Sequence, residues 1–385
     1  MEMEITLKEL GFFLEQGAQL IDVRDELSFS YGNIGGSVNI PLEQLKQSYE
    51  KYRDQKLVLY CKKGEISLLA AEFLQQKGIE AYSLKEGYLG WLMDHMSEER
   101  AGEETRITAY DVEESIRKRF RKSIWCKFTK AVREYELVKE GDRVAVCISG
   151  GKDSMLMAKL FQELKRHHKF PFEVVFLVMD PGYSPENRKI IEKNAQKLEI
   201  PVTIFESDIF ESVYHVEKSP CYLCARMRRG HLYRFAQQLG CNKIALGHHF
   251  DDVIETILMG MLHGAQVQTM MPKLHSTNFP GMELIRPLYY VREDDIKAWR
   301  DYNGLHFLQC ACKFTDSCTT CNDGQNHSMR QDTKELIRQL KKTDPDVEKH
   351  IFRSVEGVNL NTVISYKKDG VLHHFLDDYD TEKQL

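Results

Sequence analysis

Short apolar runs alternate with amphipathic helical patterns along most of the chain. Near the N-terminus, residues 19–25 (QLIDVRD) and 56–61 (KLVLYC) have the length and apolar content of buried strands. Residues 65–78 have helical periodicity, and Gly78 marks the end of that helix. Strands that alternate with helices are typical of a parallel sheet covered on both faces. We therefore predict an α/β fold for the first hundred residues.

The same alternation continues beyond the middle of the chain. Residues 143–148 predict an apolar strand, which a glycine-rich turn connects to a helix from about Ser154. Three further apolar strands, separated by helical stretches, are expected at 173–180, 201–207 and 243–248. This order predicts a doubly wound parallel sheet, in which ligands bind beyond the carboxyl ends of the strands.

At 385 residues the chain is long enough for two domains and an appendage. Hydrophobic residues make up 42% and charged residues 29%, as in ordinary globular proteins. We expect an α/β domain at 1–100, a basic linker and helix at 101–140, a second α/β domain at 141–340, and a tail at 341–385. The tail contains Asp-Pro and Asp-Gly turn signals, which assign it no function.

The sequence also indicates a cellular compartment. No run reaches the roughly 20 apolar residues that cross a membrane, and the acidic start MEMEITLKEL lacks the pattern of a signal peptide. We therefore expect a cytoplasmic protein that does not enter membranes. Thiols stay reduced in that compartment, so closely spaced cysteines more often bind metal or take part in chemistry than form disulfides.

Charge is unevenly distributed along the chain. Residues 117–133 contain eight Lys or Arg and no Asp or Glu, and subtracting this +8 from the net charge of −5 leaves −13 elsewhere. A basic segment on an acidic protein indicates a site for a polyanion such as nucleic acid, although a solvated helical face explains it equally well. The candidate contacts are Arg117, Lys118, Arg119, Arg121 and Lys122.

Cys61 lies at the end of a predicted strand, in a short loop (CKKGEIS) that leads directly into a helix. The backbone N–H groups of such a loop and the helix N-terminus favour a thiolate, and Lys62 and Lys63 add positive charge. A persulfide or thiosulfate anion would be stabilised there. Cys61 is therefore a candidate nucleophile, with a buried structural cysteine as the alternative.

The motifs IDVRDELSFSYGNIGGSVNIPL, LVLYCKKGEIS and LKEGYLGW resemble a single-domain rhodanese over residues 4–95. The resemblance implies that Cys61 accepts a sulfane sulfur as a persulfide. Phosphatase relatives need an arginine six residues after the cysteine, where this chain has Ser67, so phosphatase activity is not expected. Ile66 and Asn33 replace the Arg and His common in the family, which favours a protein sulfur donor over free thiosulfate.

The turn after the first strand of the second domain reads SGGKDS. Gly150 and Gly151 let the backbone approach a bound anion closely, and the N-terminus of the following helix supplies N–H donors. Lys152 and the hydroxyls of Ser149 and Ser154 complete a cradle for phosphate. This is not a Walker A loop, which needs four residues between its glycine and Gly-Lys-Ser/Thr.

SGGKDS between a strand and a helix resembles the PP-loop ATP pyrophosphatases. The resemblance implies cleavage of ATP between its α- and β-phosphates, adenylation of a substrate, and a role for Asp153 in magnesium binding or loop geometry. The segment GHHFDDVIET begins at the carboxyl end of another predicted strand. His248, His249, Asp251 and Asp252 are therefore expected to meet ATP, magnesium or the substrate, with a helix N-cap as the alternative for Asp251.

Six of the ten cysteines form two groups, CYLC (221–224) and CACKFTDSCTTC (310–321). Zinc or iron–sulfur binding is the expected role of such groups in a reducing compartment. Cys126, Cys147 and Cys241 have no close partners in the sequence and are expected to be ordinary small apolar residues.

Together with the loop, residues 115–335 resemble the tRNA 2-thiocytidine synthetase group through EGDRVAVCISGGKDS, CYLCARMRRG, GHHFDDVIET and IRPLYYVREDDI. The resemblance implies a 4Fe–4S cluster on three cysteines, with one iron open for sulfur. Two ligands correspond to Cys221 and Cys224. Counting from IRPL gives Cys310 as the third, which we prefer, and counting back from RQ gives Cys318. A separate zinc site on the remaining cysteines Cys312, Cys318 and Cys321 is an alternative, although three ligands are one short. A four-cysteine zinc site made by the whole second group is the other alternative.

These features predict an ATP-dependent tRNA sulfurtransferase. Mg-ATP would adenylate a base carbonyl, by family analogy at carbon 2 of cytidine 32, and sulfur would replace the oxygen. Cys61 would carry the sulfur after loading by a cysteine desulfurase or another persulfide donor. Further tRNA phosphate contacts are expected from Arg226, Arg228 and Arg229. Homodimers are common among relatives, and the sequence leaves the oligomeric state open.

Two alternatives remain. The first is a PP-loop enzyme that adenylates a small molecule, which the acidic net charge favours and the basic segment disfavours. The second is a redox-sensing iron–sulfur or zinc protein, which the intact SGGKDS and GHHFDD motifs disfavour because a sensor needs no ATP site. Copurifying tRNA would exclude the first alternative, and conversion of ATP to AMP would exclude the second.

Overall fold

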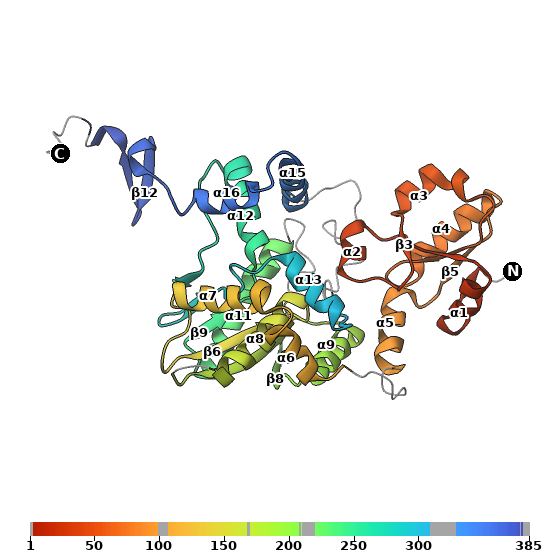
Figure 1. The fold of residues 1–385 in the computed structure, drawn as a ribbon, viewed down its shortest axis with the longest axis horizontal. Helices are drawn as coiled ribbons and strands as arrows, with labels where there is room; N and C mark the ends of the chain where they lie inside the picture. Colours follow the sequence, from red (N-terminus) through yellow and green to blue (C-terminus); the bar gives the residue numbers. More distant parts are fainter. Residues whose placement is uncertain are drawn as a thin grey trace. The chain divides into compact units, whose positions relative to one another are not determined.

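The computed structural model describes residues 3–98, 107–167, 170–207, 209, 220–308, 329–377 and 379 (Figure 1). The chain divides into two compact units, residues 1–250 with 271–327 and residues 251–270 with 328–385. The first unit contains two separate sheets, and the second contains helices and a small hairpin.

The N-terminal sheet of the first unit has five strands, all paired in parallel. Their order is β1 (Glu4–Ile5), β5 (Ala81–Leu84), β4 (Leu57–Tyr60), β2 (Gln19–Asp22) and β3 (Val38–Asn39). The helices are α1 (Leu7–Glu15), α2 (Glu26–Tyr31), α3 (Leu42–Ser48), α4 (Glu65–Gln76), α5 (Gly87–Glu98) and the 3₁₀ helix η1 (Tyr49–Tyr52). Every residue of β4 is buried, as expected for a strand of a parallel sheet with both faces covered.

The two predicted strands and the predicted helix are present in this sheet. Helix α4 ends where expected, because Gly78 adopts a φ of 80° that favours glycine and stops the helix. The core contains Leu57 and Leu59 of β4 packed with Leu74 of α4. The α/β fold predicted for the first hundred residues is therefore confirmed.

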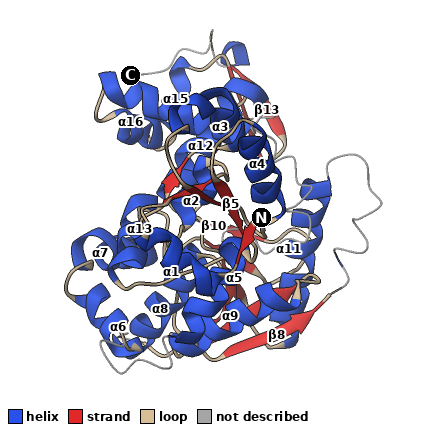
Figure 2. Ribbon diagram, turned by 90° about the vertical axis from the view of Figure 1, so that its right-hand side faces the viewer, coloured by secondary structure: helices blue, strands red, loops and turns tan. Residues whose placement is uncertain are grey.

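The second sheet has six strands and the predicted doubly wound form. Their order is β10 (Lys273–His275), β11 (Glu283–Ile285), β9 (Lys243–Ala245), β6 (Arg143–Ile148), β7 (Glu173–Asp180) and β8 (Val202–Glu206). Strand β8 forms one edge (Figure 2). Strand β10, at the other edge, pairs with β11 in antiparallel fashion, which the sequence did not predict. All other pairs are parallel.

The chain order creates a switch point at β6. From β6 the chain adds β7 and β8 on one side and then returns to β9 on the other side. The loops after β6 and β9 therefore leave the sheet in opposite directions, and the crevice between them is where open α/β sheets bind ligands. These two loops carry SGGKDS and GHH.

The helices of this part of the first unit are α6 (Ala109–Arg117), the π-helix η2 (Arg121–Trp125), α7 (Cys126–Glu134), α8 (Lys152–His167), α9 (Pro185–Lys197), α11 (Pro220–Gln238) and α13 (Glu293–Tyr302). Helix α8 begins at Lys152, two positions before the predicted Ser154. Gly150, at a φ of 86°, makes the turn that lets the helix begin directly after Gly151.

The second unit contains α12 (Phe250–Gly264, of which Phe250 belongs to the first unit), α15 (Met329–Thr343), α16 (Val347–Ser354), η4 (Leu360–Thr362) and η5 (Phe375–Asp377). Its hairpin joins β12 (Ser365–Lys368) to β13 (Val371–His374). Asp369 and Gly370 both have positive φ, which suits a two-residue hairpin turn and confirms the Asp-Gly turn signal. Across the described residues, no helix has the length and apolar character needed to span a membrane.

Candidate functional site

Cys61 follows β4 and lies beside the first turn of α4. Its side chain is buried, and the N–H of Gly64 lies 3.2 Å from Sγ. Gly64 adopts a φ of 96°, and a Cβ there would come within 2.2 Å of the Lys85 carbonyl oxygen. Glycine is thus required for the loop to turn its N–H toward the sulfur, where it can hydrogen-bond a persulfide.

Ser67 occupies the position at which a phosphatase would need arginine. Its hydroxyl lies 3.5 Å from Cys61 Sγ and 2.9 Å from the Ser83 hydroxyl, and all three side chains are buried. A neutral hydroxyl at this point can hydrogen-bond a sulfur anion but cannot clamp a phosphate. Ile66 is exposed, and Asn33 donates to the Phe29 carbonyl, so neither contributes a charge to the sulfur.

The SGGKDS loop connects β6 to α8 and is braced by its own serines. The Ser154 hydroxyl donates to the Gly151 carbonyl and accepts from the backbone N–H of Ser149, while the two serine hydroxyls lie 3.2 Å apart. A Cβ at Gly150 would meet Ile191 at 2.6 Å, so this position needs glycine for space as well as for its positive φ. The loop therefore has a fixed backbone shape before any ligand binds.

Lys152 supplies the positive charge of this loop, and its side chain is 1% exposed. Its ammonium lies 3.2 Å from Asp153 and 3.1 Å from Glu293, the first residue of α13. Burial alone would lower the pKa of Lys152, but the nearby Asp153, Tyr31 and Glu293 outweigh burial and raise it. The lysine is therefore positively charged throughout the neutral range.

Glu293 was not among the predicted site residues. It pairs with Lys152 from a position 141 residues further along the chain. The only signal in the sequence is the run VREDD, in which acidic residues open a helix, and that signal is equally typical of an ordinary helix N-terminus.

The predicted histidines follow β9 at the switch point. His249 is buried, and its Nε2 lies 3.9 Å from an Asp153 carboxylate oxygen. A Cβ at Gly247 would come within 3.3 Å of the backbone of Asp153 and Ser154, so the two loops approach closely. The structure thus brings together Lys152, Asp153 and His249.

Asp251 and Asp252 open helix α12 and belong to the second unit. Within that unit, Asp252 lies 3.3 Å from Arg330 of α15, and Glu255 of the same helix pairs with Arg330 and Lys334. These contacts join α12 to α15. They show that the acidic start of α12 has a structural role beside the ligand-binding role predicted for it.

The predicted tRNA contacts differ in how far their charges are compensated. Arg117 pairs with Glu163 at 3.0 Å, and Lys118 pairs with Glu114 at 2.8 Å. By contrast, three more of these residues are exposed: Arg119, Arg121 and Lys122. On α11, Arg226 and Arg229 are exposed, and Arg228 donates to the Tyr183 hydroxyl.

The cysteines fall into described and undescribed sets. Cys221 and Cys224 occupy the first turn of α11, three positions apart, and their side chains lie outside the described part of the structure. The whole second group, Cys310, Cys312, Cys318 and Cys321, also lies outside the described residues. Within the described residues, no three His, Cys, Asp or Glu side chains are grouped as metal ligands.

Two of the remaining cysteines behave as expected. Cys147 and Cys241 are buried in the core of the second sheet, and burial raises the pKa of Cys147 to about 12. Cys126 is exposed on α7, so it does not pack in a core as the other two do. It belongs to the basic segment, where the helix turns that position outward.

Comparison with known proteins agrees with this architecture. A PP-loop domain model matches residues 121–317, and a Rhodanese-like domain model matches residues 6–94. The tRNA-cytidine(32) 2-sulfurtransferase of Acaryochloris marina is 34% identical, covering 60% of this chain and 80% of that protein. The tRNA-cytidine(32) 2-sulfurtransferase of Alcanivorax borkumensis is 36% identical, covering 60% of this chain and 78% of that protein.

Among solved structures, the U34-tRNA thiolase NcsA from Methanococcus maripaludis with its 4Fe–4S cluster is 22% identical, covering 60% of this chain and 76% of that one with a TM-score of 0.47. The PP-loop match and the two bacterial relatives are extensive enough to show the family. At the level of the family, the prediction of a tRNA sulfurtransferase enzyme is confirmed. The chain belongs to the family of the tRNA-cytidine(32) 2-sulfurtransferases, and it carries a rhodanese-like domain ahead of its PP-loop domain.

Proposed function

We propose that this chain is an ATP-dependent tRNA sulfurtransferase that replaces the oxygen on carbon 2 of cytidine 32 by sulfur. The observation that carries the proposal is a glycine loop with a buried, charged lysine at a switch point, in a family whose named relatives act on that nucleotide. Oxygen on a pyrimidine ring is a poor leaving group, so the reaction needs prior activation by ATP.

The PP-loop residues would supply that activation. The backbone N–H groups of Gly150 and Gly151 and the N-terminus of α8 would hold the phosphates that leave as pyrophosphate. The Lys152 ammonium would offset the charge that develops when the base oxygen attacks the α-phosphate. Asp153 would bind the magnesium, and His248 and His249 would border the nucleotide. The ATP-binding role of Asp251 and Asp252 stays a prediction from the sequence.

The rhodanese-like domain would carry the sulfur. The Gly64 N–H and the Ser67 hydroxyl, both within hydrogen-bonding range of Cys61 Sγ, support a role for Cys61 in which it accepts sulfur as a persulfide. A cysteine desulfurase or another persulfide donor would load it. Release of sulfide from the persulfide consumes two electrons, which an external thiol would supply, and AMP leaves the base when sulfur is attached.

An iron–sulfur cluster fits the cysteines of this chain. Cys221 and Cys224 are about one helical turn apart in α11, a spacing that suits two thiolate ligands of one cluster. Cys310 is our third ligand, with Cys318 as the alternative, and Cys312, Cys318 and Cys321 are candidates for a separate zinc site. A bound 4Fe–4S cluster would supply an iron at which sulfur is held for transfer.

The cluster proposal predicts the metal content of the protein. Anaerobically purified Cys221→Ser protein is expected to lose most of its iron and acid-labile sulfide, because one thiolate ligand is missing. Cys126→Ser, which changes the exposed cysteine of α7, is the matched control and should keep both. Equal iron in the two variants, or zinc in place of iron in the wild type, would contradict the assignment of Cys221.

The tRNA would approach along exposed cations. Six of the predicted contacts are exposed, which supports phosphate contacts of the kind that orient tRNA without reading its sequence. They are Lys118, Arg119, Arg121 and Lys122 of the basic segment and Arg226 and Arg229 of α11. Arg117 and Arg228 are only partly exposed and would contribute less. A single-stranded nucleotide of the anticodon loop is the kind of base that such an enzyme can reach.

Mass spectrometry of tRNA nucleosides tests the function directly. A strain that lacks this protein should lose 2-thiocytidine, and the wild-type gene or Cys126→Ser should restore it. Cys61→Ser should restore only part of the product, because other persulfides could still load the PP-loop domain slowly. An unchanged nucleoside profile in the deletion strain would reject cytidine thiolation and favour a small-molecule substrate.

A further inference from the structure

The first unit contains direct contacts between the rhodanese-like domain and the PP-loop domain. The end of helix α2 lies against α13, and Trp91 of α5 packs edge-on against His306 with ring centroids 5.6 Å apart. His95, stacked on Trp91, lies equally close to His306. The two domains therefore meet at two places that are far apart in the sequence.

Arg300 makes the polar part of this contact. Its side chain is 10% exposed, and its guanidinium donates to the carbonyls of Ser30, at 3.2 Å, and of Tyr31. These are among the last carbonyls of α2, which have no partner within the helix and carry partial negative charge. Arg300 thus caps a helix of the other domain.

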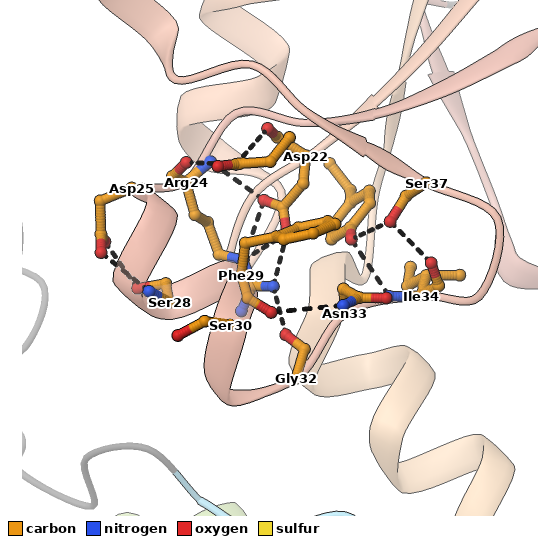
Figure 3. A network of polar contacts seen from close by, with 12 residues as sticks. Asp22, Arg24, Asp25, Ser28, Phe29, Ser30, Gly32, Asn33, Ile34 and Ser37 are labelled. Atoms are coloured by element: carbon orange, nitrogen blue, oxygen red, sulfur yellow. Dashed lines mark hydrogen bonds and ion pairs between the residues drawn. The ribbon is translucent and has the colours of Figure 1, made fainter. Parts of the chain in front are cut away.

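The backbone around this cap is held rigidly inside the rhodanese-like domain. Arg24 donates to the Gly32 carbonyl at 2.8 Å and pairs with the buried Asp22, as Figure 3 shows. A Cβ at Gly32 would lie 2.2 Å from the Tyr88 hydroxyl, so the turn after α2 packs tightly on α5. The position of Tyr31 is therefore set by the rhodanese-like domain itself.

Tyr31 covers the lysine of the PP-loop. Its ring centroid lies 4.3 Å from the Lys152 ammonium, which also contacts Asp153 and Glu293. With the Lys152 side chain only 1% exposed, a phosphate oxygen can reach the ammonium only if one of these neighbours moves away. A cation–π contact is weaker than a buried ion pair, so Tyr31 can leave at the least cost.

We infer that the rhodanese-like domain docks on the PP-loop through Tyr31 and Arg300, and that ATP binding and this docking exclude each other. The inference rests on the proposed function, because it takes Lys152 as a phosphate ligand. Docking would hold the sulfur-carrying domain on α13 until ATP binds. ATP would release the contact, so that the domain becomes free to move when a substrate can be activated.

Two measurements on the full-length chain test this. Calorimetric titration with magnesium and α,β-methylene-ATP, which cannot be cleaved at the reacting bond, should show binding about 3- to 30-fold tighter for Tyr31→Ala than for the wild type. Tyr31→Phe keeps the ring over Lys152 and should stay close to the wild type. Arg300→Gln, on the other side of the contact, should also tighten binding.

Amide hydrogen exchange gives the second readout. Saturating the wild type with the same analogue should speed exchange in residues 26–34, whereas Tyr31→Ala should exchange quickly with or without it. Equal affinities in all variants, or weaker binding by Tyr31→Ala, would overturn mutual exclusion while leaving the ATP site intact. Failure of both the wild type and Tyr31→Ala to bind the analogue would overturn the proposed function as well.

Discussion

Substitution of Lys152 by methionine is expected to lower the rate of ATP-to-AMP conversion by about 100- to 1,000-fold, the usual effect of removing one preorganised donor from a transition state. The ammonium is buried, charged at neutral pH and attached to the first residue of α8, beside the N–H groups that we propose to hold the phosphates. Methionine fills a similar volume but has no charge to offer the α-phosphate as the base oxygen attacks it.

Lys165→Met is the matched control. Lys165 lies on the same helix, near its other end, and its side chain is exposed. The control should convert ATP at the wild-type rate. The loss of Lys152 also removes one ion-pair partner of Glu293, although Glu293 keeps its ion pair with Lys297. Thermal unfolding of both variants would therefore separate a catalytic defect from a folding defect. Similar rates in the two variants would show that Lys152 does not act on the phosphates.

The sequence predicted those features that depend on local pattern. Strand β6 has the predicted bounds, 143–148, and strand β7 coincides with the predicted run 173–180. Both strands are almost wholly apolar, and strong turn signals flank them, so hydrophobic pattern alone fixes their limits. The glycine loop could be found from its local sequence for the same reason. Position 150 needs glycine because its φ is positive and because Ile191 leaves no space for a Cβ.

Features that depend on distant parts of the chain could not be predicted in this way. Glu293 and Tyr31 both reach Lys152, but nothing in their local sequence indicates that lysine. Arg117 appeared to be one more cation of a polyanion site, and its pairing with Glu163 shows that part of the basic segment holds the fold together. Charge in a sequence gives the sign of a residue but not the partner that compensates it.

That pairing belongs to a buried ionic network between α6 and α8. Lys159, whose side chain is fully buried, lies 2.6 Å from Glu113, and Arg166 donates to the other oxygen of the same carboxylate. Glu163, also fully buried, accepts from Arg117 and Arg166. Helix α8 carries the PP-loop at its other end, so this network anchors the helix on which the proposed phosphate site is built.

Glu113→Gln is accordingly expected to lower the free energy of unfolding at pH 7 by about 3–5 kcal/mol, because it leaves the Lys159 ammonium buried without a carboxylate partner. Its matched control is the neighbouring Glu114→Gln, which breaks the exposed pair with Lys118 and should change stability little. Chemical denaturation of both variants measures the difference. Equal losses would mean that the buried network contributes no more than a surface ion pair.

The pH dependence of that difference gives an independent check. Burial raises the pKa of Glu113, but hydrogen bonds from Arg166 and Lys159 outweigh it and hold the pKa below the ordinary value of 4.5. A carboxyl whose pKa is depressed on folding stabilises the protein above its unfolded pKa, and this stabilisation disappears as the pH falls through the folded pKa. The gap between wild type and Glu113→Gln should therefore be full at pH 7 and shrink only below 4.5. A gap that closed at neutral pH would show that Glu113 is not held as a carboxylate by Lys159 and Arg166.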